Sequence, residues 1–186
     1  TRWVVKRTGT VREVAHARVA QSRFYRVWNV ADYASPDMES LQLLGQVLAD
    51  GRNSRLYKRL VIDEQLATGV DISISGRVLG AQFMIVADVK PGRDIARVEA
   101  IIAEELDRVL ADGPTAAELT RVRTATIASF IRSMESLSSK ASLLAESQTY
   151  LGDAGAWKAG HARYASATSL QVRDAGRAWL MDGDYV

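Results

Sequence analysis

Residues 49–70, ADGRNSRLYKRLVIDEQLATGV, connect a helical pattern to a strand pattern, and the elements on either side are best assigned outward from them. Gly51 tolerates the left-handed conformation that ends helices, so it predicts the end of the preceding helix. Asn53 or Ser54 is then the expected N-cap of a short helix, whose apolar residues keep helical spacing as far as Leu60.

The segment before this stretch predicts a strand followed by a helix. Residues 23–30, RFYRVWNV, are rich in aromatic and β-branched residues, which is typical of a strand. Phe24 and Trp28 face one side and Tyr25 and Val27 the other, which indicates a central or covered position in a sheet.

Capping signals mark the helices. Ser35-Pro36-Asp37 predicts an N-cap, a first helical residue and a favourable acidic first turn, with an apolar stripe over residues 38–48. Thr115–Glu118 and Thr168–Gln171 are capping boxes that begin two further helices. Apolar residues continue at helical spacing after the first box, but the serines of 133–139 favour a bend or break.

Two strands and one more helix lie after the opening stretch. Residues 70–76 alternate apolar and polar, residues 81–89 repeat the alternation, and the short turn between them predicts an antiparallel hairpin. Asp94 can cap the helix that follows, and Gly113 ends it. Because strands come first and helices follow, the expected class is α+β, an antiparallel or mixed sheet with helices on one face.

Composition excludes several kinds of protein. The 186 residues suit one domain with a real core, no 18-residue apolar run could span a membrane, and the lack of cysteine excludes disulfides and thiolate chemistry. Residues 1–26 hold seven basic residues against one acidic residue. Residues 1–22 are therefore expected to be a basic linker or an edge strand over Val11–Val19, and 23–186 a single domain truncated within a strand that begins at Tyr185. A nucleic-acid-binding module led by this basic segment is a weaker alternative.

The order Gly51-x-x-Ser-Arg-Leu-Tyr57, then Leu60-Val61, then Glu64-Gln-Leu-Ala67 resembles the insulinase/pitrilysin family of zinc peptidases, over about residues 23–180. The resemblance implies the metallohydrolase-like fold of the insulinase and mitochondrial processing peptidase type. It points to the C-terminal domain of one half of such an enzyme, which does not bind the metal.

Metal ligands are scarce in the chain. The family's zinc motif is His-x-x-Glu-His, but the two histidines, His16 and His161, are isolated, and Glu104 and Glu105 point to different faces of a helix. No Gly-x-Ser-x-Gly motif indicates a serine nucleophile. We therefore expect no catalytic residue, no zinc and no peptide cleavage in this chain alone, with zinc held elsewhere in a parent zinc metalloendopeptidase.

In the family, an Arg and a Tyr seven residues apart approach the substrate from the partner half. Those positions correspond to Val61 and Thr68 here, and neither side chain can replace Arg or Tyr as a donor. The resemblance thus implies that such a pair comes from a partner, or that this half is non-catalytic.

The functional expectation is a domain that helps to enclose and bind peptide substrate. Leu66, Val70 and Ile72, on the strand edge over 66–75, are the candidate contacts for a peptide that adds as a strand. Packing of this edge on a neighbouring domain is an equally good reading. The implied partners are a preceding zinc-binding domain and a second half or partner subunit, as in a dimer. The alternative is a non-catalytic scaffold of the same fold, and the compartment, periplasm or cytoplasm, stays open.

Overall fold

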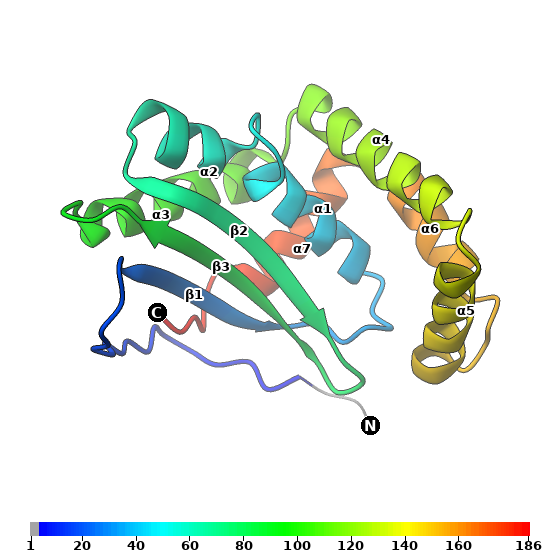
Figure 1. Ribbon diagram of the computed structural model, residues 1–186. Coiled ribbons are helices and arrows are strands. Elements are labelled where there is room, and N and C mark those ends of the chain that lie inside the picture. The colour runs from blue at the N-terminus through cyan, green and yellow to red at the C-terminus, as the bar shows by residue number, and fades with distance from the viewer. Residues whose placement is uncertain (1–3) are drawn as a thin grey trace.

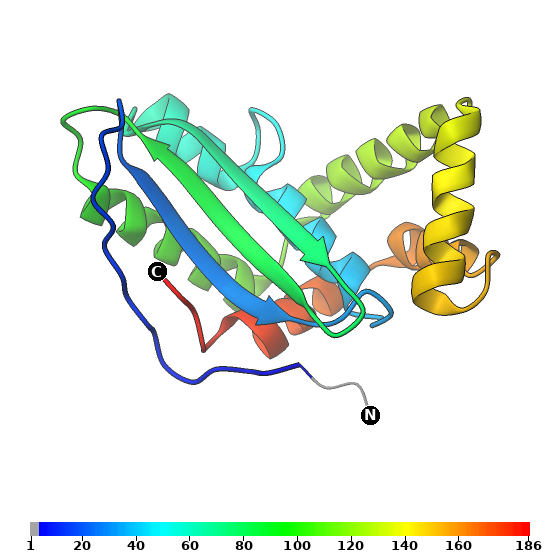
Figure 2. The same ribbon diagram turned by 60° about the horizontal axis from the view of Figure 1, so that its bottom comes forward.

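The computed structural model describes residues 4–186, and its sheet has three antiparallel strands in the order β1-β3-β2. These strands are β1 (Arg23–Val30), β2 (Ala67–Gly76) and β3 (Ala81–Val89). The helices lie on one face of the sheet or beyond its edge, and the other face is open (Figures 1 and 2). The α+β class expected from the sequence is therefore confirmed.

The core forms between the covered face of the sheet and the helices. In the middle strand, Phe83 is fully buried and pairs with Trp28 on one side and Ile74 on the other. The rings of Trp28 and Phe83 meet edge to face at 6.1 Å, a favourable aromatic geometry. Alternation along β3 thus places one set of side chains in the core and the other on the open face.

The expected central position of β1 is wrong, because β3 is the middle strand. On the open face Tyr25 is 43% exposed, so the apolar residues on this side of β1 do not indicate a covered strand. Part of the outer edge of β1 is nevertheless occupied, since Val27 exchanges two backbone hydrogen bonds with Tyr185, at 2.9 and 2.8 Å.

Helices and helical turns make up the second layer. They are α1 (Met38–Ala49), α2 (Arg55–Tyr57), the π-helical turn η1 (Lys58–Asp63), α3 (Ile95–Asp112), α4 (Ala116–Ser133), α5 (Leu137–Glu146), the π-helical turn η2 (Ser147–Leu151), α6 (Trp157–Ser166) and α7 (Ser169–Leu180). No helix among the described residues combines the length and apolar character that crossing a bilayer requires.

Most of the predicted helix ends are confirmed. Asp94 accepts a hydrogen bond from the backbone of Ala96, and Thr115 and Thr168 form the two expected capping boxes. The start of α1 differs from the prediction. The Ser35 hydroxyl accepts from the backbone of Asp37 in a turn before the helix, so α1 begins two residues after Pro36 and has no side-chain cap.

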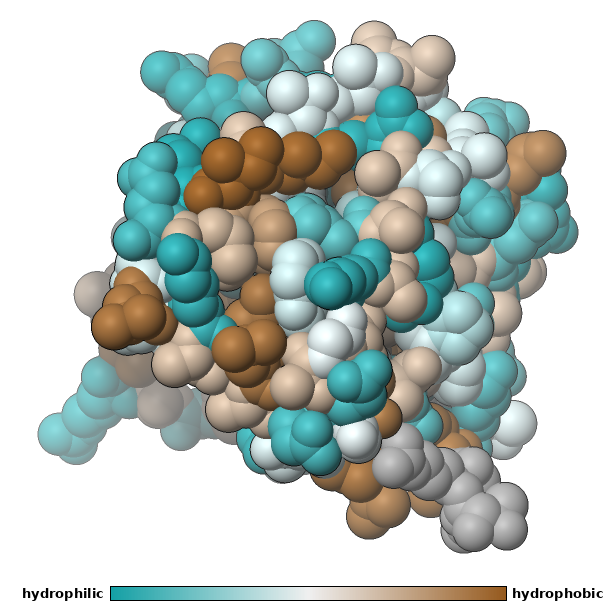
Figure 3. Space-filling view, turned by 90° about the vertical axis from the view of Figure 1, so that its right-hand side faces the viewer, coloured by the Kyte–Doolittle hydropathy of each residue, from teal (hydrophilic) through white to brown (hydrophobic). Residues whose placement is uncertain are grey.

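The helices at one end of the molecule leave apolar side chains uncovered. The chain bends between α4 and α5, as the serines over 133–139 predict. Beyond Val122, the apolar positions of this segment are not buried: Ile131 is 61% and Leu137 82% exposed. Figure 3 views this end and shows apolar side chains scattered among polar ones.

The N-terminal segment lies along the outer side of β1 (Figure 2). The strand expected over Val11–Val19 is reduced to one parallel bridge between Val11 and Tyr185. Arg12 forms a bidentate ion pair with Glu99, and Asp184 accepts hydrogen bonds from Thr10 and Arg26 at 2.6 Å each. A domain boundary at residue 22 stays a prediction.

Candidate functional site

Residues 49–70 connect α1 to β2, and local hydrogen bonds and two left-handed backbone positions set their path. Gly51 has φ +78°, as a helix-ending glycine requires, and Ser54 precedes α2. The Ser54 hydroxyl does not cap the helix but donates to the carbonyl of Gly51 at 2.7 Å. Gln65 has φ +50°, a conformation uncommon outside glycine, and the backbone N–H of Leu66 donates to Leu60. This geometry sets the entry of β2.

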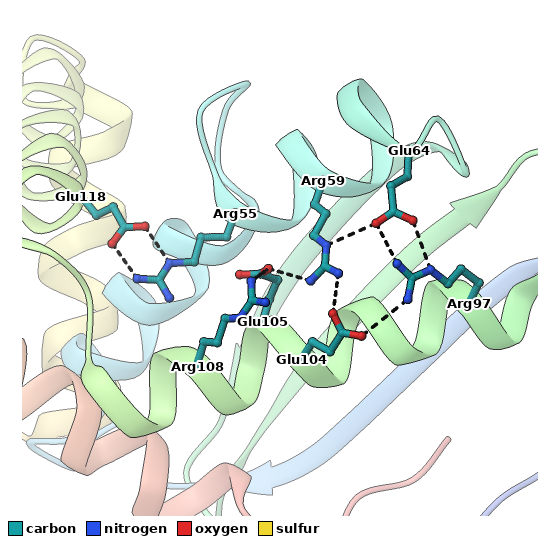
Figure 4. Close-up of polar contacts among 8 residues, drawn as sticks. All are labelled: Arg55, Arg59, Glu64, Arg97, Glu104, Glu105, Arg108 and Glu118. Atoms are coloured by element: carbon teal, nitrogen blue, oxygen red, sulfur yellow. Dashed lines mark hydrogen bonds and ion pairs between the residues drawn. The ribbon is translucent and has the colours of Figure 1, made fainter.

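A network of arginines and glutamates fastens η1 to α3 (Figure 4). Arg59, on η1, contacts Glu105 at 2.9 Å, Glu64 at 3.4 Å and Glu104. Arg97 reaches Glu64 at 3.0 Å and Arg108 reaches Glu105 at 2.8 Å, which extends the network along α3. The side chain of Glu105 is only 8% exposed, so its charge depends on these partners.

A second ion pair ties α2 to the start of α4. Arg55 donates to both carboxylate oxygens of Glu118, at 2.6 and 2.7 Å (Figure 4). Burial acts to raise the pKa of Glu118, but the hydrogen bonds from Arg55 and from the capping residue Thr115 outweigh it and lower this pKa to about 2. Glu118 therefore stays ionised and holds the stretch against α4.

The free edge of β2 borders a groove beside α1. Among residues 4–186 β2 pairs only with β3, so its other edge has no strand partner there. The groove has a volume of about 370 Å³, and its walls are Gln42, Gly45, Gln46, Ala49, Asp50, Asp71, Ile72 and Ile74. The close approach of α1 to β2 depends on Gly45, where a Cβ atom would lie 3.0 Å from Ile72 Cγ2.

Two carboxylates border this groove. Asp50, the residue after α1, and Asp71, on β2, both line it, and both are exposed. Among the hydrogen bonds and ion pairs of residues 4–186, none involves either carboxylate. The Asp50 backbone carbonyl, in contrast, accepts from Arg121 at 3.0 Å.

The structure separates the three candidate edge residues. Val70 and Ile72 lie on β2 and pack partly against the core, and Ile72 also lines the groove. Leu66 lies before β2, and its carbonyl already accepts the backbone N–H of Lys90 at 2.9 Å. Leu66 therefore has less to offer a peptide backbone than the residues within β2.

The two positions that correspond to the family's Arg and Tyr pair also differ in surroundings. Val61 lies on η1 and packs partly against the core. Thr68 is exposed on β2, where its hydroxyl donates to the carbonyl of Asp88 at 3.3 Å. Each side chain thus has a structural environment of its own.

Metal-ligating side chains do not converge in the described part of the chain. Within residues 4–186 no three His, Cys, Asp or Glu side chains group as a metal site. His161 lies on α6 with its ring 3.6 Å from that of Phe130, and burial lowers its pKa. His16 is exposed on the N-terminal segment. The residues present do not fit a zinc site.

The groove is the feature that sequence reasoning missed. Alternation marks Asp71 as outward-facing, and Gln42 and Gln46 stand four residues apart on one helix face, but neither pattern shows that α1 and β2 lie side by side. Gly45, among the buried residues of α1, is the one signal of a close approach that could have been used.

Comparison with known proteins agrees with this geometry. Residues 3–126 match the family model described as the peptidase M16 inactive domain. No curated protein sequence matches the chain.

Solved structures share the fold. A protease from Helicobacter pylori is 20% identical with a TM-score of 0.90 over 97% of this chain, which spans only 44% of that protein. The inactive peptidase domain of a Bordetella parapertussis protein is 23% identical, with a TM-score of 0.77 over 92% of this chain and 97% of its own. Complex III from Candida albicans contains a chain 9% identical, with a TM-score of 0.78 over 97% of this chain and 45% of its own. Because the family model matches about two thirds of this chain, the chain belongs to the peptidase M16 inactive-domain family.

Proposed function

We propose that this chain is the C-terminal, non-metal-binding domain of one half of a zinc metalloendopeptidase, and that it helps to enclose and bind peptide substrate. In this proposal the His-x-x-Glu-His motif and its zinc lie in a preceding domain. A second half or partner subunit closes the site and supplies the Arg and Tyr that Val61 and Thr68 replace here.

The observation that carries the proposal is the open edge of β2 beside a groove, in a domain of the M16 inactive family. An unpaired strand edge offers a row of backbone donors and acceptors to an extended peptide. Binding through the main chain gives affinity with weak sequence demands, which suits a peptidase that accepts unfolded segments. The chain spans less than half of the H. pylori protease, which leaves room there for the partner domain that the proposal needs.

A non-catalytic scaffold is the second candidate, because a chain of complex III from Candida albicans has the same fold. The two candidates make different predictions about the rest of the gene product. A His-x-x-Glu-His motif upstream of residue 1 favours the peptidase, and its absence from both that region and any partner subunit favours the scaffold.

The binding role can be tested on the chain itself by hydrogen exchange. A random-coil peptide of about 12 residues should slow exchange of the backbone amides in β2 and leave those of α3, which pack away from the edge, unchanged. The same peptide should remain intact in the presence of zinc. Cleavage that copurifies with the chain and is lost on chelation would overturn the non-catalytic assignment, and peptide binding without any slowing in β2 would overturn the edge as the binding site.

A further inference from the structure

We propose that the free edge of β2 selects extended peptide segments that carry basic side chains, with Asp50 on the groove side and Asp71 on the open face as the selecting residues. The inference rests on the proposed function and adds a preference to it, since a bare strand edge is indifferent to side-chain charge.

The first step is geometric. Side chains of an added strand alternate between the two faces of the sheet, as do those of β2 itself. Ile72 and Ile74 point to the helix side, where the groove lies, and Asp71 points to the open face. One set of peptide side chains would therefore enter the groove toward Asp50, and the other set would lie beside Asp71.

The second step is electrostatic. Neither carboxylate has an ion-pair partner among the described residues, and the other groove walls are glutamine, glycine, alanine and isoleucine, which carry no charge. Within residues 4–186, the guanidinium of Arg121 donates a hydrogen bond only to the backbone carbonyl of Asp50, at 3.0 Å. A basic side chain on the open face of the added strand would lie opposite Asp71, about 4.5–5.5 Å away between Cβ atoms, and one on the other face would point into the groove toward Asp50. Two consecutive basic residues would satisfy Asp50 and Asp71 together.

The third step concerns the alternative occupants. An acidic segment would place like charges together, and a neutral segment would leave both carboxylates unpaired, although neither loses the main-chain hydrogen bonds. The preference for basic segments therefore adds only modestly to the affinity that the strand edge provides through the main chain. Because the carboxylates are exposed, each should contribute about 1.5- to 5-fold in affinity, and the factor should shrink as salt rises above about 0.5 M.

The test uses fluorescein-labelled 12-residue peptides that differ only in a central pair, Arg-Lys, Gln-Gln or Glu-Glu, with binding measured by fluorescence anisotropy. We expect the order Arg-Lys, then Gln-Gln, then Glu-Glu. Asp50→Asn and Asp71→Asn should each weaken only the Arg-Lys peptide. The control variant Asp107→Asn removes another exposed carboxylate, on α3, and should change nothing.

The outcomes separate the preference from the binding role. Equal affinities for the three peptides, lost when the peptide backbone is N-methylated, would keep edge binding and overturn the basic preference. An Arg-Lys preference that Asp107→Asn weakens as much as Asp71→Asn would also overturn the preference, by reducing it to overall charge. Affinity that is indifferent to N-methylation would overturn edge binding itself.

Discussion

Glu118→Gln isolates the charge of the carboxylate that joins Arg55 to the start of α4. Gln serves in a capping box as well as Glu does, so the substitution keeps the cap and removes the bidentate ion pair. The pKa of Glu118 is lowered from 4.5 to about 2, which corresponds to an upper bound of about 3 kcal/mol. Because the pair is partly exposed to solvent, which screens it, we expect a loss of about 2 kcal/mol at pH 7.

The sign of the pH dependence follows from the lowered pKa. A carboxylate whose folded-state pKa lies below its unfolded value stabilises the fold above the unfolded pKa and loses this contribution as the pH falls toward the folded pKa. The difference between wild type and Glu118→Gln should therefore be constant above about pH 5.5 and drop below half of its pH 7 value by about pH 3.

Urea unfolding followed by tryptophan fluorescence at pH 7, 5 and 3 measures this difference. Glu135→Gln is the matched control, since Glu135 is exposed and has no ion pair among the described residues, and it should change stability by less than about 0.5 kcal/mol. A wild-type advantage over Glu118→Gln that is the same at pH 3 as at pH 7 would refute the argument, because at pH 3 the unfolded chain binds a proton at Glu118 that the folded chain mostly does not, which must reduce the advantage.

Three further predictions concern the frame around the site. Gly113→Ala should lower the free energy of unfolding in urea by about 2–4 kcal/mol, because φ 78° with ψ 177° is a region for glycine alone and the new Cβ atom would meet Ser169 Oγ at 2.6 Å. The control Gly92→Ala, at φ 74° in open space, should lower it by only about 1–2 kcal/mol. Equal losses in the two variants would contradict a role for the contact with Ser169. Arg59→Met should lower the free energy of unfolding by about 1–2 kcal/mol at low salt and by less in 1 M NaCl. The control Arg93→Met removes an exposed arginine and should leave this free energy unchanged at both salt concentrations. A loss for Arg59→Met that does not depend on salt would argue against the network. Burial raises the pKa of Tyr164 above the usual range, so absorbance at 295 nm should rise equally up to pH 11 in wild type and Tyr164→Phe, and a smaller rise in the variant would show that Tyr164 ionises normally.

Local signals proved sufficient for most element types and many ends. The capping boxes at Thr115 and Thr168 and the bend after Ser133 depend on residues within four positions of one another, so the pattern alone predicts them. The predicted start of α1 was wrong for a reason that is also local. The Ser35 hydroxyl could cap the helix or accept a hydrogen bond in a turn, and in the structure it does the latter.

Residues 49–70 illustrate how far a motif reaches. Its order of residues was enough to indicate the family, and the family model matches residues 3–126, which include this stretch. It did not show that Arg55 would meet Glu118, 63 positions away, or that Arg59 would meet Glu105, 46 positions away. Contacts at such separations depend on how α2 and η1 pack against α3 and α4.

The strands and helices, the helix caps and the family all depend on residues close together in the sequence, so they could be predicted before any packing was known. The middle place of β3, the exposure of Ile131 and Leu137, and the acidic groove between α1 and β2 arise from contacts between segments far apart in sequence. Periodicity tells which side of an element is apolar, but not which neighbour, if any, covers that side, because that is settled by the joint packing of the whole chain.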